Sequence, residues 1–158
     1  MLNQADLTST IKIIPWFLEL GPESLQRLSK IAEVRSFEKG EVIFSEGEQH
    51  PFLYVILDGR VSLESYVPGH GSMPILTAES LDIIGWSSLT PVVRQKTSTA
   101  QVLEHTTLLT FPADQLMNAC EADCDLGFVI MRRLANVVAS RMLNHRLHLL
   151  GIISSQGE

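Results

Sequence analysis

The residue types best suited to chemistry gather in one stretch of the chain, residues 82–102. There an apolar pair runs into a glycine, and hydroxyl groups, backbone amides and two positive side chains follow closely. Amides, hydroxyls and cations are the groups with which proteins bind anions. The stretch therefore predicts a pocket for a small anionic ligand. Its candidate ligand-binding residues are Gly85, Trp86, Ser87, Ser88, Arg94, Lys96 and Thr97.

Catalytic and metal-binding sets are not evident in the sequence. Ser87 and Ser88 lack the Gly-x-Ser-x-Gly elbow of a serine hydrolase, and helix capping explains them without catalysis. A jelly-roll metalloenzyme needs two histidines one residue apart on a strand, whereas His70 and His105 stand alone. We therefore expect a protein that is not an enzyme, with no catalytic residue, no metal site and no obligatory cofactor.

The composition fits one globular domain of the cytoplasm. The chain has 158 residues and a formal net charge of −6, with a pI of about 5.3. An acidic chain without a basic run is a poor partner for nucleic acid. No apolar run reaches membrane-spanning length, and the N-terminus lacks the pattern of a signal peptide, so no membrane contact is expected. In the cytoplasm Cys120 and Cys124 would be reduced thiols.

Short strands must position the candidate pocket. Residues 1–33 read as an N-terminal helical segment, in which Pro22 suits the first position of a helix. Residues 34–112 change to a period of two and contain several short apolar runs separated by glycine and proline. This pattern is typical of a closed barrel or jelly roll. The strongest hairpin signal is Asp58-Gly59, because both residues tolerate positive φ.

Residues 113–158 read as C-terminal helices, a short one through Ala122 and a long one from Asp123. The long one has apolar residues at spacings of three and four, the heptad pattern of a coiled coil. One small barrel cannot cover so long a helix, so we expect a parallel homodimer. His145 is either a pH-sensitive contact in this seam or a partly solvated side chain. The predicted interface is Phe128, Met131, Ala135, Val138, Met142, His145, Leu149 and Ile152.

Four segments in order resemble the cyclic-nucleotide-binding domain of the Crp/Fnr regulators. They are Pro15–Leu20 (PWFLEL), Phe37–Gly47 (FEKGEVIFSEG), Leu53–Val61 (LYVILDGRV) and Leu103–Phe111 (LEHTTLLTF). The resemblance implies a mainly β fold with flanking helices. It consists of a double-stranded β-helix (jelly-roll) barrel, N-terminal helices and a long C-terminal dimerisation helix.

The candidate pocket lies where that family carries its phosphate-binding cassette. The resemblance implies a Gly-Glu pair that opens a short helix, followed about ten residues later by an Arg-Ser/Thr pair. Here the first pair is Gly85-Trp86 and the second is Lys96-Thr97, while Arg94 stands two residues early. Leu81 occupies a position where the family usually has glycine.

These departures weaken the case for cyclic nucleotides. Trp86 cannot accept the ribose hydroxyl, and Lys96 replaces a two-point guanidinium with a point charge. Losing the charged acceptor should cost about 1.5–3 kcal/mol of binding. We therefore expect weak or absent cAMP binding. Either another small, anionic ligand binds, or Trp86 points into the barrel pocket and fills it against apolar barrel residues.

Nothing after Gly151 could form the winged helix-turn-helix of those regulators, so this chain is not expected to bind DNA. Met1 and the short polar tail favour a complete protein, although a fragment would look the same. The resulting hypothesis is a stand-alone regulatory sensor that signals through a dimer or a partner protein. The alternative is a structural interaction module with a plugged pocket.

Overall fold

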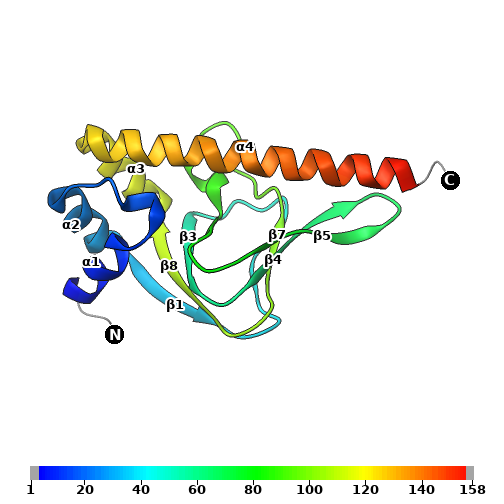
Figure 1. Cartoon of the computed structure of the whole chain (residues 1–158), viewed down its shortest axis with the longest axis horizontal. Coiled ribbons are helices and arrows are strands. Elements are labelled where there is room, and N and C mark those ends of the chain that lie inside the picture. Colours follow the sequence, from blue (N-terminus) through cyan, green and yellow to red (C-terminus); the bar gives the residue numbers. More distant parts are fainter. Residues whose placement is uncertain (1–3, 156–158) are drawn as a thin grey trace.

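The N-terminal segment consists of short helices at one end of the molecule (Figure 1). The computed structural model describes residues 4–155, so the predictions for residues 1–3 and 156–158 lie outside it. The helices are α1 (Gln4–Lys12), the 3-10 helix η1 (Pro15–Phe17) and α2 (Pro22–Ile31). Pro22 opens α2 as predicted, and Leu25 and Leu28 are buried on its inner face.

Within residues 4–155, eight strands form two antiparallel sheets, which confirms the mainly β fold. The first sheet has the order β1-β8-β3-β6 and the second has the order β2-β7-β4-β5. The strands are β1 (Glu33–Phe37), β2 (Val42–Phe44), β3 (Phe52–Asp58), β4 (Val61–Val67), β5 (Gly71–Ala78), β6 (Ile83–Ile84), β7 (Thr99–Val102) and β8 (Thr106–Pro112). A 3-10 helix, η2 (Trp86–Leu89), follows β6.

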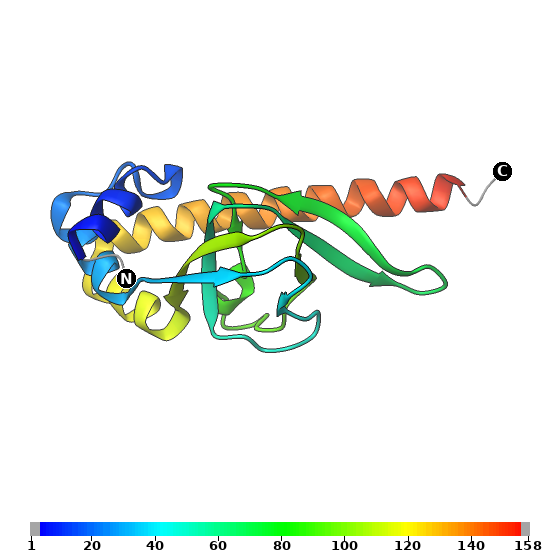
Figure 2. The same ribbon diagram turned by 90° about the horizontal axis from the view of Figure 1, so that it is seen from below.

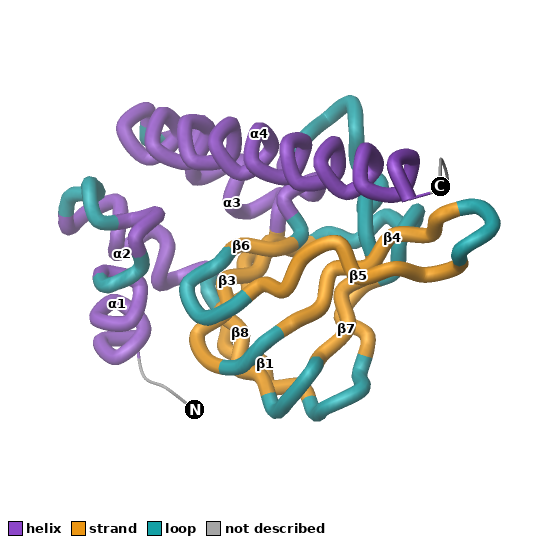
Figure 3. The backbone as a smooth tube through the Cα atoms, turned by 45° about the vertical axis from the view of Figure 1, so that its right-hand side comes forward, coloured by secondary structure: helices purple, strands orange, loops and turns teal. Residues whose placement is uncertain are grey.

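The two sheets do not close into one hydrogen-bonded barrel, so the prediction of a closed barrel is wrong in this respect. Within the described residues, strands pair only inside their own sheet, and one isolated bridge joins Gln49 to Gln95. The edge strands β2 and β6 have only three and two residues, too few to carry a ladder from one sheet to the other. Figure 3 shows the resulting open arrangement of strands beneath the C-terminal helix.

The Asp58-Gly59 turn is a corner between the sheets and not the predicted hairpin. β3 pairs with β6 and β8, whereas β4 pairs with β5 and β7. Gly59 has φ +101°, and a Cβ there would lie 2.3 Å from Oγ1 of Thr106. The residue types thus describe the tight turn correctly, but they do not determine which strands pair on either side of it.

Two apolar clusters make up the core. One lies between the first sheet and the helices and includes Phe17, Phe111 and Leu116. The other lies between the two sheets and includes Phe44, Tyr54 and Leu63. A side chain of η2 can therefore pack into one cluster or the other, and this choice determines whether it enters the space between the sheets.

Two C-terminal helices complete the fold, α3 (Ala113–Ala122) and α4 (Cys124–Ser155). The junction is capped by Asp123, whose carboxylate accepts hydrogen bonds from the Ser24 hydroxyl and the Leu126 amide. Farther along α4, Arg132 and Arg133 both form ion pairs with Glu19. The N-terminal half of α4 is therefore fixed against the N-terminal helices.

The C-terminal half of α4 runs past the sheets and contacts η2 and β5. Figure 2 shows α4 extending along the whole molecule, with the β4–β5 hairpin reaching out beside its last turns. The 32 residues of α4 span about 48 Å at 1.5 Å per residue. One helix thereby connects the N-terminal segment to the region above the candidate pocket.

Candidate ligand pocket

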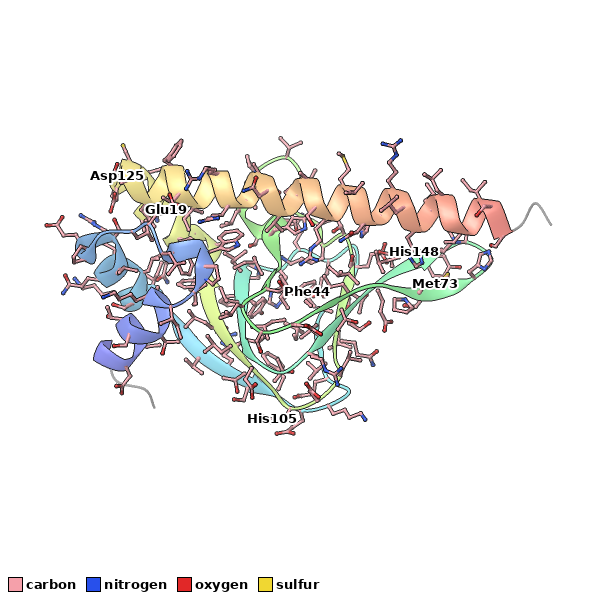
Figure 4. The ribbon with its side chains drawn as sticks, in the orientation of Figure 1. Glu19, Phe44, Met73, His105, Asp125 and His148 are labelled. Carbon is pink, nitrogen blue, oxygen red and sulfur yellow. The ribbon has the colours of Figure 1, made fainter. Side chains whose placement is uncertain are left out.

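A small cavity lies between the second sheet, η2 and α4. Its volume is about 20 Å³. Five of the seven predicted ligand-binding residues line it, namely Gly85, Trp86, Ser87, Lys96 and Thr97. The remaining lining residues are Phe44, Leu63, Ile84, Ser98, Arg141 and His145. Figure 4 places Phe44 in the middle of the molecule, beneath α4.

Gly85 turns the chain from β6 into η2. It has φ +79° and ψ +23°, the left-handed conformation that glycine adopts without strain. A Cβ at this position would lie 2.8 Å from the carbonyl oxygen of Phe52. The Gly85 carbonyl accepts hydrogen bonds from the Ser88 amide at 3.1 Å, the Ser88 hydroxyl at 2.8 Å and the Lys96 ammonium at 3.2 Å.

Lys96 is the buried cation of the cavity, with only 2% of its surface exposed. Its Nζ lies 5.1 Å from the centroid of the Phe44 ring, and its backbone exchanges hydrogen bonds with Gly47 and Glu48. Burial lowers the pKa of Lys96 to about 8, although the charge of Glu48 opposes part of the shift. The lysine is held in place without a carboxylate in ion-pair contact.

Arg141 and His145 reach the same cavity from α4, and sequence reasoning missed Arg141 entirely. Nη2 of Arg141 donates to the Ile83 carbonyl at 2.9 Å, and burial lowers the pKa of this guanidinium. Burial also lowers the pKa of His145, and the nearby Arg141 lowers it further, while Glu46 opposes the shift. These surroundings therefore favour the neutral form of the His145 imidazole.

The placement of His145 differs from the predicted dimer seam for a geometric reason. A straight α-helix drifts about 20° per heptad relative to a perfect 3.5-residue repeat, so a heptad stripe winds around the helix. Exposed seam residues are Phe128, Met131, Ala135, Met142 and Leu149. Val138 and Ile152 are partly covered, and His145 faces the cavity.

Trp86 lines the cavity but does not fill the space between the sheets, where the sequence suggested it would lie. It is partly buried and packs against the apolar cluster that the first sheet shares with the helices. That cluster also includes Leu134 and Val138 of α4. Trp86 is thus part of the wall on the α4 side.

Ser88 and Arg94 lie outside the cavity. Both line a separate groove of about 630 Å³ beside α3, together with His50 and Met117. The Ser88 hydroxyl donates a hydrogen bond to the Gly85 carbonyl. Arg94 is exposed on the loop before the Gln49–Gln95 bridge. The predicted anion-binding set is therefore divided between two places.

Within residues 4–155, no three His, Cys, Asp or Glu side chains lie close enough together to hold a metal ion. No helix in this part of the chain is both long and apolar enough to cross a membrane.

Facing antiparallel sheets with a small cavity beneath a long C-terminal helix define a domain of the jelly-roll type. The profile of the cyclic nucleotide-binding domain matches residues 34–123, which is more than half of the chain. The chain therefore belongs to the cyclic nucleotide-binding domain family. The match includes every predicted ligand-binding residue but ends before Arg141 and His145.

One curated relative is solute carrier family 9 member C1 of Mus musculus. It is 39% identical over 67 residues, which are 42% of this chain and 6% of the relative. The chain thus corresponds to a small part of that protein.

Solved structures confirm the resemblance to Crp/Fnr-type domains. A protein from Geobacter metallireducens GS-15 described as cyclic nucleotide-binding is 26% identical, with a TM-score of 0.73 and coverage of 90% of this chain and 99% of that one. The catabolite activator protein of Thermus thermophilus is 22% identical, with a TM-score of 0.71 and coverage of 89% and 63%. The regulatory subunit of a cAMP-independent protein kinase A from Trypanosoma brucei is 15% identical, with a TM-score of 0.77 and coverage of 94% and 51%. The fold therefore includes a protein described as cAMP-independent.

Proposed function

We propose that this chain is a regulatory sensor whose cavity binds a small oxyanion, and that it binds cAMP weakly or not at all. The observation that carries the proposal is that two cations, the buried Lys96 and the partly buried Arg141, line one cavity. Neither forms an ion pair among the described residues, since their hydrogen bonds go to the carbonyls of Gly85 and Ile83. An anion between them would offset the cost of burying two positive charges.

The size of the cavity supports a small ligand. One water molecule needs about 10–15 Å³ of such space, so 20 Å³ holds one water, and only an anion of a few heavy atoms could enter with a small shift of the lining side chains. Bicarbonate, nitrate and formate are compact planar oxyanions with a single negative charge. A cyclic nucleotide would require Arg141 and His145 to move away, and with them the segment of α4 that carries both.

Thermal unfolding in the presence of sodium bicarbonate, nitrate or formate tests the proposal, with chloride added to keep the ionic strength constant. A ligand that binds only the folded state raises Tm in a concentration-dependent way. We expect this rise in the wild type and in Arg146→Gln, whose arginine is exposed on the same helix. Arg141→Gln should lose it. An equal response of both variants, or no response beyond chloride, would refute anion binding in this cavity.

Cyclic nucleotide binding is a separate question that calorimetry with cAMP answers. Weak or absent binding is expected, because Trp86 supplies no acceptor for a ribose hydroxyl. Trp86→Glu combined with Lys96→Arg should restore the carboxylate that accepts from the ribose hydroxyl and the guanidinium that binds the phosphate at two points, as the family resemblance implies. Micromolar binding by the wild type would show that these departures are tolerated variation.

A second candidate function is a structural interaction module whose cavity holds no ligand. The small volume and the wall formed by Trp86 favour it. Partners would then bind elsewhere, and the exposed apolar face of α4 suits a second copy of this chain. A homodimer through α4 belongs to both candidates, as does the cytoplasmic location inferred from the sequence.

A further inference from the structure

Lys96 differs from the other lysines of the chain in its surroundings. Lys12, Lys30 and Lys39 are exposed, whereas Lys96 is buried at the cavity with its amine 3.2 Å from the Gly85 carbonyl. The groups that face it are the Phe44 ring, the charges of Arg141 and Glu48, and the imidazoles of His50 and His145. No carboxylate within residues 4–155 forms an ion pair with it.

We propose that Lys96 reacts with carbon dioxide to form a carbamate inside the cavity, so that the domain carries a reversible modification site for dissolved CO₂. The inference rests on the proposed function, because it assumes that the cavity accepts a small oxyanion. It differs from that function in that the ligand becomes covalently attached.

The reaction balances without any further reagent. The lone pair of the neutral amine attacks the carbon of CO₂, a nitrogen–carbon bond forms, and one carbon–oxygen π pair moves to oxygen. The nitrogen then loses one proton, and the product is a carbamate anion. The imidazole of His145 lines the same cavity, and in its neutral form it can accept this proton before it passes to solvent.

The surroundings of Lys96 favour each requirement of this reaction. Burial lowers the pKa of its amine to about 8, which supplies the neutral nucleophile near physiological pH. The remaining carbamate N–H can still donate to the Gly85 carbonyl, which is 3.2 Å from Nζ. The new negative charge would share the cavity with Arg141 and the hydroxyls of Ser87 and Thr97.

The consequence would be a reversal of charge at the cavity. A carbamate on Lys96 would carry the charge opposite to that of Arg141, which lines the same cavity, and their attraction would hold α4 against η2. Dissolved CO₂ would therefore stabilise the contact between α4 and η2.

Chemical trapping tests the inference on the full chain. The protein is equilibrated with ¹³C-labelled CO₂ and bicarbonate, the carbamate is alkylated with triethyloxonium, and peptides are identified by mass spectrometry. We expect the labelled ethoxycarbonyl group on Lys96 and not on exposed Lys39 of the same sample. This internal comparison does not depend on the folding of any variant. Arg141→Gln should lower the labelling at least several-fold, whereas Arg146→Gln should leave it unchanged.

Each outcome separates the two proposals. If Lys96 carries no label, or no more than Lys39, the carbamate is refuted. If bicarbonate then still raises Tm as nitrate does, the cavity is a non-covalent anion site and the proposed function stands. If neither labelling nor stabilisation occurs, both proposals fail.

Discussion

Replacing Lys96 with methionine should make the protein more stable at neutral pH. The wild-type side chain keeps a positive charge 98% removed from solvent without a carboxylate partner, and its pKa falls from 10.5 to about 8. This lowering of the pKa corresponds to roughly 3 kcal/mol of unfavourable free energy for the charged form. Methionine has a similar length and no charge. The Gly85 carbonyl would still accept hydrogen bonds from the amide and the hydroxyl of Ser88, so it would not be left unpaired.

The loss of the Lys96 hydrogen bond offsets part of this gain. One such bond contributes about 1 kcal/mol, which leaves a net stabilisation of about 2 kcal/mol. For a chain of this size that corresponds to a rise in Tm of about 4–8 °C.

The pH dependence supplies the sharper signature. The folded-state pKa is lowered, so between pH 8 and 10.5 the unfolded chain binds more protons at Lys96 than the native chain does. The wild type therefore gains stability relative to Lys96→Met as pH rises through this window. Below pH 8 the advantage of the variant is largest, and near pH 10.5 it disappears.

Urea unfolding of both proteins at several pH values from 6.5 to 10.5 measures this difference. Subtracting the two curves cancels the titration of all other groups, and Lys39→Met is the matched control because Lys39 is exposed. A difference that stays constant across the window would show that Lys96 is not the buried amine of lowered pKa described above. If Lys96→Met is less stable than the wild type at pH 7, the hydrogen bond and ring contact of Lys96 outweigh the cost of its desolvation.

Two further predictions concern the backbone before the pocket and the outer face of α4. Leu81 has φ +74° where the family usually has glycine, so Leu81→Gly should stabilise the chain by about 1 kcal/mol in urea unfolding; an unchanged or lower midpoint would contradict this. Met142 is 70% exposed in the predicted seam, so Met142→Asp should convert dimers to monomers in sedimentation equilibrium. A wild-type chain that is monomeric at micromolar concentration would remove the basis of the second prediction.

Local residue chemistry predicted much of the fold. Pro22 opens α2, and Gly85 adopts the left-handed turn before η2. Each of these features depends on a few adjacent residues, which a single sequence displays directly.

Features that depend on distant partners were not predictable in the same way. Asp58-Gly59 predicts a turn, but the strands on its two sides belong to different sheets. Arg141 carries no signal in the sequence that relates it to Lys96, because its place at the cavity depends on how α4 lies across η2. A periodic pattern of apolar residues identifies the helix without fixing its rotation.

The helix α4 contributes to both the cavity and the proposed dimer surface. One face of this helix carries Arg141 and His145 into the cavity, and another exposes Phe128, Met131 and Met142. Because both faces belong to one helix, a ligand that displaces Arg141 also displaces the surface proposed for the dimer. Binding free energies are reciprocal, so dimer formation would change ligand affinity by the same factor by which the ligand changes dimer affinity. Measuring ligand affinity and dimer affinity on the same preparation therefore tests whether ligand binding in the cavity is coupled to dimer formation through α4.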